Sequence, residues 1–282
     1  MKLDQTNKEW ESLAASDPMW AVLTDPLMKD GRWEAADFFA AGANEVETIW
    51  ELLNDLNKQP STGLAVDFGC GVGRLAQALA RRFQKVLAVD CSPSMLKKAS
   101  ELDASNGKIE WRLNESENLN SINDGVADFV FSSIVLQHIP VSNAKQFILE
   151  FCRILKPGGL LCFQIPTKRV TTFHEQYQKI KHYLFGKLAL RTRLRGLKAG
   201  RWISLPHKNS SANIIRMHTT KLSDLERTVI EGGCSVITKK FTNHTAANFN
   251  GKLTLRDEPF LSDGYVSALF IVEKIPFNVS SE

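Results

Sequence analysis

The sequence lacks the features that mark membrane-spanning, secreted and disulfide-stabilised proteins. No apolar run among the 282 residues approaches the roughly 20 that a membrane-spanning helix requires. The N-terminal segment is polar and does not resemble a signal peptide. The five cysteines are odd in number and show no paired spacing, which predicts free thiols and a cytoplasmic protein.

Metal-ligand patterns and repeats are also absent. The sequence contains neither a C-x-x-C pair nor an H-E-x-x-H pattern, so it indicates no zinc site, and we predict no metal. It shows no internal repeat and no low-complexity tract. With 43% apolar residues, the chain can build a sizeable core, either as one large domain or as two small ones.

The sequence does contain a glycine-rich turn between an apolar run and a helical pattern. Residues 64–66 are apolar, Asp67 follows, and glycines stand at positions 69, 71 and 73. Strand, glycine turn and helix in this order form a nucleotide-type cofactor site, because glycine lets a ligand lie against the main chain. The G-x-G-x-G spacing differs from the dinucleotide fingerprint. A carboxylate before the turn would repel a pyrophosphate, but it suits a cationic ligand.

Further strands follow along the chain. Residues 86–89 form a second apolar run that ends in Asp90, 23 residues after Asp67, where α/β proteins present an acid to ribose hydroxyls. Ser92 and Pro93 then predict a helix start, as N-cap and first helical residue. Three more strands are predicted near residues 109, 127–133 and 160–165. Five strand–helix steps within about a hundred residues predict a parallel sheet covered by helices on both faces.

Taken in order, these motifs resemble those of class I S-adenosylmethionine-dependent methyltransferases of the small-molecule type. The resemblance is firm over residues 62–166 and weaker over 221–275, and it rests on residues 67–73, Asp90, the loop around Glu115, and residues 127–129 and 155–159. It implies an α/β fold with a doubly wound, mostly parallel, seven-stranded sheet, the Rossmann-like methyltransferase fold. The expected parts of the chain are an N-terminal helical cap (1–61), a cofactor-binding core (62–166), a basic insertion or lid after the fifth strand (167–220) and the C-terminal part of the core sheet (221–282).

The resemblance implies S-adenosyl-L-methionine as the cofactor and assigns a role to each matched position. Asp67 is expected to meet the methionine ammonium, and Gly69 and Gly71 to let the amino-acid portion lie on the main chain. Asp90 is expected to take both ribose hydroxyls, because a carboxylate only accepts hydrogen bonds. The full set of expected cofactor-binding residues is Asp67, Gly69, Cys70, Gly71, Asp90, Cys91, Glu115, Ser116 and Ser132.

Two positions in this set have a neighbour as a rival, because one sequence does not determine the register of a loop. Glu115 is expected to reach the adenine amino edge, with Asn114 as the alternative. Ser132 or Ser133 is expected beside the methionine end of the cofactor, at the mouth of the fourth strand.

His138 is the expected catalytic residue. It follows the fourth strand, at the sheet edge where open α/β folds bind ligands. Histidine has a pKa near neutrality and suits a base that activates a hydroxyl, whereas a neutral amine needs no base. The alternative is that His138 only packs and hydrogen-bonds the loop before Pro140. Histidines at positions 174, 182, 207 and 218 are further candidates if their segment folds over the site.

Charge is strongly segregated along the chain. Residues 168–221 hold 13 Lys or Arg and one acid, a balance of +12, whereas the rest of the chain stands at −8. This predicts either a solvated basic face or a lid that attracts an anionic substrate. The segment lacks an aromatic-rich RNA-binding signature, which disfavours nucleic acid as a partner. Residues 183–191 mix apolar and basic side chains, which leaves peripheral membrane contact open, although their helical periodicity is poor.

The predicted helical cap carries four of the six tryptophans, at positions 10, 20, 33 and 50. These rings either pack on the sheet or wall a substrate pocket. The leading function is methyl transfer to an oxygen or nitrogen of a small-molecule acceptor, because the cap and the insertion can enclose one. The alternatives are an RNA or protein methyltransferase that uses the basic insertion, and a catalytically silent S-adenosylmethionine-binding protein. The acceptor and the oligomeric state stay open.

Overall fold

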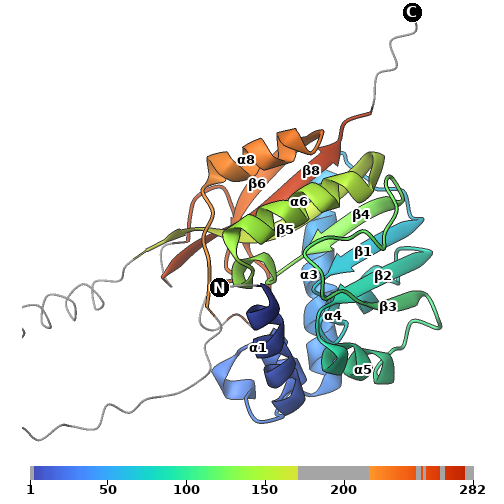
Figure 1. Cartoon of the computed structure of the whole chain (residues 1–282), viewed down its shortest axis with the longest axis vertical. Coiled ribbons are helices and arrows are strands. Elements are labelled where there is room, and N and C mark those ends of the chain that lie inside the picture. The colour runs from blue at the N-terminus through green and yellow to red at the C-terminus, as the bar shows by residue number, and fades with distance from the viewer. Residues whose placement is uncertain (1–2, 171–215, 246–248, 250–251, 261–263, 277–282) are drawn as a thin grey trace, which may run out of the picture.

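A mixed β-sheet with helices on both faces forms the centre of the protein (Figure 1). The computed structural model describes residues 3–170, 216–245, 249, 252–260 and 264–276. Within these residues the sheet has eight strands, in the order β3-β2-β1-β4-β5-β8-β6-β7. The strands are β1 (Leu64–Phe68), β2 (Lys85–Asp90), β3 (Ile109–Leu113), β4 (Ala127–Ser132), β5 (Leu155–Arg169), β6 (Cys234–Thr242), β7 (Leu255–Arg256) and β8 (Tyr265–Lys274).

The strand directions confirm the predicted doubly wound, mostly parallel sheet. Strands β3, β2, β1, β4 and β5 are parallel, and β8 lies antiparallel between β5 and β6. The described sheet has one strand more than the seven predicted, because the two-residue β7 pairs with the end of β6. A strand of two residues has no alternating pattern that the sequence could show.

Strand β4 illustrates why the central strands can be predicted from the sequence. All six of its residues are buried, as a parallel strand covered on both faces requires. The start of helix α5 (Pro93–Glu101) is likewise determined by neighbouring residues in the sequence. Ser92 accepts the Met95 N–H at 3.0 Å, and Pro93 is the first helical residue, as predicted.

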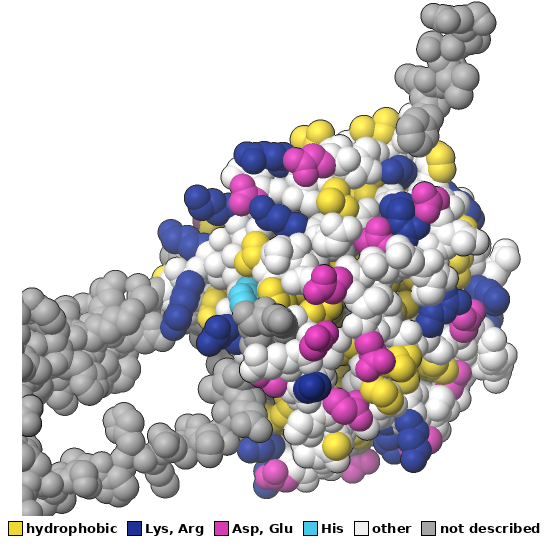
Figure 2. Space-filling model, viewed as in Figure 1, with side chains coloured by type: hydrophobic (Ala, Val, Ile, Leu, Met, Phe, Trp, Pro, Cys, Tyr) yellow, Lys and Arg dark blue, Asp and Glu magenta, His cyan; other side chains and the backbone are white. Residues whose placement is uncertain are grey.

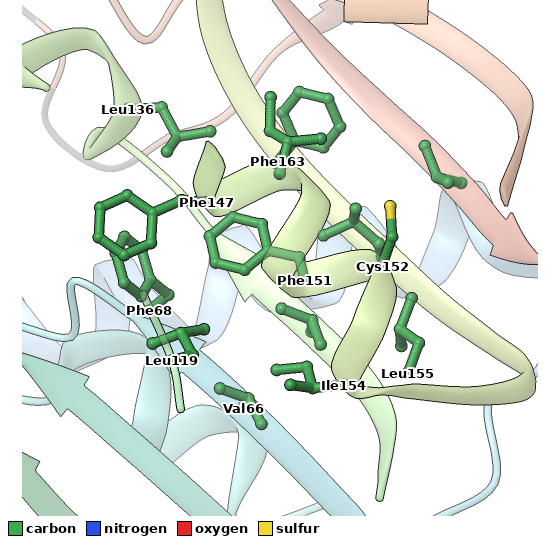
Figure 3. Close-up of a cluster of buried hydrophobic side chains, with 14 of the residues drawn as sticks. Val66, Phe68, Leu119, Leu136, Phe147, Phe151, Cys152, Ile154, Leu155 and Phe163 are labelled. Carbon is green, nitrogen blue, oxygen red and sulfur yellow. The ribbon is translucent and has the colours of Figure 1, made fainter. Parts of the chain in front are cut away.

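Helices α6 (Val141–Ile154) and α8 (Leu222–Glu231) cover one face of the sheet, and α3 (Ala35–Asp55), α4 (Arg74–Leu79) and α5 cover the other (Figure 1). Aromatic rings fill much of the first face (Figure 3). Phe68, the last residue of β1, lies with its ring centroid 4.6 Å from that of Phe147 and 5.0 Å from that of Phe151, both on α6. These contacts hold α6 against the end of β1, next to the glycine turn.

The predicted helical cap separates into two parts. Helices α1 (Leu3–Ser16) and α2 (Pro18–Val22) and the 3₁₀ helix η1 (Pro26–Met28) come first, and α1 contacts α5. Helix α3 packs directly on the sheet, where the ring of Trp50 lies 5.2 Å from that of Phe129. Glu11 ties α1 to the start of α5, because its carboxylate accepts the Ser92 hydroxyl at 2.5 Å and the Ser94 N–H at 3.3 Å. The Ser92 and Ser94 hydroxyls lower the pKa of Glu11.

Strand β5 extends the sheet past the expected boundary at residue 166. Its last residue, Arg169, still pairs with Tyr265 of β8. Residues 156–159 fall inside β5 at the point where its pairing with β4 shifts register.

Most of the predicted basic lid lies outside the described residues. Residues 171–215 include the segment 183–191 and the histidines at 174, 182 and 207. Within the described part of the chain, no helix is long and apolar enough to cross a membrane.

Candidate active site

A pocket opens at the C-terminal edge of the sheet, between the ends of β1, β2 and β4 and the helices α1 and α2. Open α/β sheets bind their ligands at this edge. The space inside it is about 790 Å³, including the part open to solvent. Its walls are Leu3, Thr6, Asn7, Trp10, Val22, Phe68, Gly69, Gly71, Val89, Asp90, Cys91, Met95, Asn114, Ser116, Ser133, Ile134, Val135, Ile139 and Phe147.

The glycine turn after β1 brings bare main chain to this pocket. Gly69 and Gly71 have φ angles of 75° and 53°, in the left-handed region that other residues rarely adopt. A Cβ at Gly69 would lie 2.3 Å from the side chain of Val135. The turn therefore needs glycine for two reasons, its backbone angles and the close approach of a neighbour.

Asp90, at the end of β2, holds the turn in place. Its Oδ2 accepts the Gly71 N–H at 2.8 Å, and its Oδ1 accepts the Ser92 N–H at 2.9 Å. Burial raises the pKa of Asp90, and these backbone N–H groups oppose the increase. Each carboxylate oxygen can accept more than one hydrogen bond, so Asp90 can still take hydroxyl donors from the pocket side.

The loop after β3 contributes two residues to the pocket wall. Asn114 and Ser116 line the wall, whereas Glu115 between them is exposed to solvent. The Ser116 hydroxyl donates to Asn114 Oδ1 or to the Asn118 carbonyl, each at 2.9 Å, which orders the loop. Asn7 of α1 reaches across and donates its Nδ2–H to the Glu115 carbonyl at 3.4 Å. Helix α1 thus closes over this part of the pocket.

The exit from β4 places Ser133, and not Ser132, on the pocket wall. Ser132 is fully buried and donates its hydroxyl to the Phe68 carbonyl at 3.1 Å. Ile134 follows with a φ of 64°, which is rare for a β-branched residue. Its N–H donates to Gln164 Oε1 at 2.9 Å, which holds the unusual conformation. Strained backbone of this kind concentrates at functional sites, since the surrounding structure must enforce it.

Behind Ser133 lies a buried polar group that the sequence analysis missed, formed by Glu45, Arg74, Ser133 and His244 and called the Glu45 cluster below. Arg74 Nη1 lies 2.7 Å from Glu45 Oε2, and both side chains are almost completely buried. Burial alone would raise the pKa of Glu45, but the charges of Arg74 and His244 outweigh it and lower the value to about 2. A signal for Glu45 did exist, because it occupies a core-facing helical position between Ala41 and Ile49.

Asp67 lies at the end of β1 beside this cluster. Its side chain is 1% exposed, and its Oδ2 has no hydrogen-bond partner among the described residues. Burial raises the pKa of Asp67 to about 7; Arg74 opposes the shift, and the negative charges of Asp90 and Glu45 add to it. A buried carboxylate oxygen without a partner is uncommon and suits a cation bound nearby.

The pKa of Asp67 predicts a proton-coupled affinity for a cationic ligand. Below pH 7 Asp67 is protonated in the free protein, and a cation bound nearby favours the carboxylate, so binding releases a proton. The affinity for S-adenosylmethionine is therefore expected to rise by up to about tenfold per pH unit as the pH approaches 7, and then to level off. Calorimetry between pH 5.5 and 7.5, in buffers of different ionisation enthalpy, measures both quantities. Asp67→Asn is expected to flatten the profile, and a flat profile in the wild type would contradict the assignment.

His138 lies in the 3₁₀ helix η2 (Leu136–His138), next to the pocket but not among its wall residues. Its ring packs against Trp10, a wall residue, with centroids 5.1 Å apart. The Gln137 amide lies 3.0 Å from His138 Nε2 and donates to it. Burial lowers the pKa of His138 to about 4, which keeps the ring neutral. A role as base requires the Gln137 hydrogen bond to be exchanged, and it stays a prediction.

The structure thus gathers part of the predicted set on one wall. Among the predicted cofactor residues, those that line the pocket are Gly69, Gly71, Asp90, Cys91 and Ser116, and those that do not are Asp67, Cys70, Glu115 and Ser132. Within the described residues, no group of three or more His, Cys, Asp or Glu is arranged to hold a metal ion.

Known proteins resemble this chain mainly over the core that forms the pocket. Residues 66–163 match the family described as methyltransferase domain. Over 117 residues the chain is 31% identical to the ubiquinone biosynthesis O-methyltransferase of Maricaulis maris, covering 41% of this chain and 45% of that protein. It is 34% identical over 109 residues to the biotin biosynthesis bifunctional protein BioHC of Cellvibrio japonicus, covering 39% and 21%. The chain spans less than half the length of these curated relatives.

Solved structures share the fold over nearly the whole chain. Magnesium protoporphyrin IX methyltransferase from Synechocystis PCC 6803, with bound SAH, superposes with a TM-score of 0.56 at 18% identity, covering 95% of this chain and 97% of that chain. Phosphoethanolamine N-methyltransferase 1 of Haemonchus contortus has a TM-score of 0.58 at 16% identity, covering 99% and 50%. The matched family and the shared sheet order together identify a methyltransferase domain in this chain, over residues 66–163.

Proposed function

We propose that the protein transfers a methyl group from S-adenosylmethionine to an oxygen or nitrogen of a small-molecule acceptor. The observation that carries this proposal is the enclosure of the pocket by α1 and α2. Much of the wall beyond the glycine turn is apolar, and it includes the side chains of Leu3, Trp10, Val22, Ile134, Val135, Ile139 and Phe147. A covered apolar space favours a small acceptor with an aromatic or aliphatic body over a polymer strand.

The residues of the pocket fit the cofactor. When bound, S-adenosylmethionine supplies a methyl group on a positively charged sulfur, and the protein contributes position and electrostatics. Asp90 would accept the ribose hydroxyls, and Asn114 and Ser116 stand where the adenine edge is expected. The main chain at Gly69 and Gly71 is open to the amino-acid portion, beside the unpartnered Asp67 oxygen.

The pocket wall and the relatives both bear on which kind of acceptor the proposal favours. Methyl transfer needs a lone pair about 3 Å from the methyl carbon, in line with the sulfur, so the wall must orient the acceptor closely. The ubiquinone biosynthesis O-methyltransferases among the relatives support an oxygen acceptor. No Lys or Arg lines the described wall, so the predicted anionic acceptor draws no support from it.

The five cysteines, all unpaired, support the cytoplasmic location predicted above.

A macromolecular acceptor is the rival proposal, because of the basic charge in residues 168–221. On the face shown in Figure 2, basic and acidic side chains of the described residues are interspersed. A polynucleotide needs a basic track of one sign, and the described residues on this face do not form one. We therefore treat RNA and protein acceptors as outcomes of the test.

The test follows the label from methyl-labelled S-adenosylmethionine. The protein is incubated with the small-molecule fraction of a cell extract and, separately, with its RNA and protein fractions. We expect label in the small-molecule fraction only, with the product identified by mass, and none with Asp90→Ala at limiting cofactor. Label confined to RNA or protein would establish the rival proposal. Cofactor binding without transfer to any fraction would indicate a catalytically silent protein.

A further inference from the structure

We propose that the Ser133 hydroxyl is a hydrogen-bond acceptor of fixed polarity for the ammonium group of the cofactor, and that Glu45 and His244 are the positioning residues that fix it. This inference rests on the proposed function only in taking S-adenosylmethionine as the bound molecule. It concerns the Glu45 cluster, whose members come from α3, the start of α4, the exit of β4 and the residues after β6.

The cluster reaches the pocket wall through one residue. Glu45, Arg74 and His244 are 0%, 2% and 4% exposed and do not line the pocket, whereas Ser133 does. Keeping an ion pair out of water costs free energy, which is recovered only by close geometry and further hydrogen bonds. A buried network that ends in a residue of the pocket wall indicates that the hydrogen-bonding state of the Ser133 hydroxyl matters.

The hydrogen-bond pattern determines the polarity of Ser133. Glu45 is ionised beside Arg74, so Glu45 Oε1 can only accept. The Ser133 Oγ lies 2.6 Å from Glu45 Oε1, so the single hydroxyl hydrogen of Ser133 is donated there. For any further partner, the Ser133 hydroxyl is left with lone pairs only.

His244 reinforces this arrangement through its tautomer. Its Nε2 lies 3.1 Å from both Glu45 Oε1 and Ser133 Oγ. Because the carboxylate cannot donate, Nε2 must carry the hydrogen. The Nδ1 lies 2.9 Å from the Thr242 hydroxyl, which orients the ring. Ser133 therefore cannot turn its hydrogen toward His244, and it is an acceptor for any group that reaches it from the pocket.

The charged groups near Ser133 favour a cationic group as the hydrogen-bond donor to its hydroxyl. The charges that act on Asp67 are those of Arg74, Asp90 and Glu45, so three carboxyl groups surround one guanidinium. Asp67 Oδ2 is buried without a partner in the same region. Of the two cationic groups of S-adenosylmethionine, the sulfonium has no hydrogen to donate, and the ammonium has three. The ammonium can donate both to the acceptor on Ser133 and to the unpartnered oxygen of Asp67.

The decisive experiment compares two ligands that differ in the amino-acid portion. S-adenosylhomocysteine carries the ammonium, whereas 5′-methylthioadenosine keeps the adenosine and the thioether but lacks the ammonium and carboxylate. Calorimetry of Ser133→Ala is expected to show a loss of about 10- to 100-fold in affinity for S-adenosylhomocysteine, the loss of one hydrogen bond to a charged group. Affinity for 5′-methylthioadenosine should be unchanged, which also shows that the variant is folded.

Ser132→Ala is the matched control, because it removes the adjacent buried hydroxyl, which donates to Phe68 and does not line the pocket. It should leave the affinity for both ligands unchanged. His244→Leu removes the donor next to Ser133 and is expected to weaken S-adenosylhomocysteine selectively. His244→Gln can place an N–H near the same point and is expected to restore part of the affinity.

Three results would overturn the inference. Unchanged S-adenosylhomocysteine affinity in Ser133→Ala would mean that the hydroxyl faces the methyl acceptor or no ligand. An equal loss for both ligands would mean that the cluster is only structural. Wild-type affinity in His244→Leu would remove His244 as a positioning residue. A wild-type protein that binds S-adenosylhomocysteine but methylates nothing would contradict the proposed function and leave this binding result intact.

Discussion

Arg74→Met is expected to lower the free energy of unfolding by about 3–5 kcal/mol, because it leaves the Glu45 carboxylate buried without its guanidinium. Arg74 and Glu45 are 2% and 0% exposed, and their charged atoms lie 2.7 Å apart. The surroundings have little room to adjust, since a Cβ at Gly42 of α3 would lie 2.3 Å from the Arg74 carbonyl. Chemical denaturation at pH 7 measures the effect.

The control for this variant is Arg82→Met. Arg82 forms an ion pair with Glu47, also on α3, but their side chains are 30% and 60% exposed. An exposed pair contributes about 0–1 kcal/mol, so this variant should be nearly neutral. The double variant Glu45→Gln/Arg74→Met should recover part of the lost stability, because it removes both charges. Equal effects of Arg74→Met and Arg82→Met would show that the buried pair is not the cause.

The same pair makes stability depend on pH in a defined direction. The folded protein lowers the pKa of Glu45 from 4.5 to about 2. Its contribution is therefore present above pH 4.5 and is lost as the pH falls from 4.5 through 2. Arg74→Met should reduce the slope of stability against pH in that window.

Asp90→Ala is expected to weaken the binding of S-adenosylmethionine by about 2–3 kcal/mol, or roughly 30- to 150-fold. Two effects combine in this loss. The carboxylate that would take the ribose hydroxyls disappears, and the N–H groups of Gly71 and Ser92 lose the acceptor that holds the turn. Calorimetry with the purified variant measures it. An unchanged affinity would place the ribose contact elsewhere.

The control variant Asp128→Ala distinguishes a loss of cofactor affinity from a loss of folding stability. Like Asp90, Asp128 accepts a backbone N–H: its buried carboxylate accepts the Leu64 N–H at 2.7 Å and the Lys156 ammonium at 2.8 Å. It lies near the first residue of β4, at the sheet edge opposite the pocket. Its removal is expected to reduce stability and to leave cofactor affinity unchanged at a temperature where the variant is folded. Equal weakening by both variants would indicate general destabilisation.

Local features of the sequence are sufficient to predict the core of the fold and one side of the site. Asp67, Gly69 and Gly71 lie within a single strand–turn segment, and Asp90 ends the next strand. Buried parallel strands read as continuous apolar runs, and glycines mark the turn between strand and helix. The order of these elements therefore indicates both the sheet and the place of the cofactor before any coordinates are known.

Contacts between distant parts of the chain decide the rest, and no local pattern encodes them. Glu45 and His244 meet across 199 positions of sequence, because α3 and the end of β6 pack at the same sheet edge. Whether Ser132 or Ser133 faces the pocket depends on the direction in which the chain leaves β4, and Ile134 turns it with a left-handed φ. The sequence determines which segments become strands and which sheet edge holds the pocket. Only tertiary packing decides which side chains complete the site, since a side chain's neighbours depend on how separate elements are juxtaposed in space.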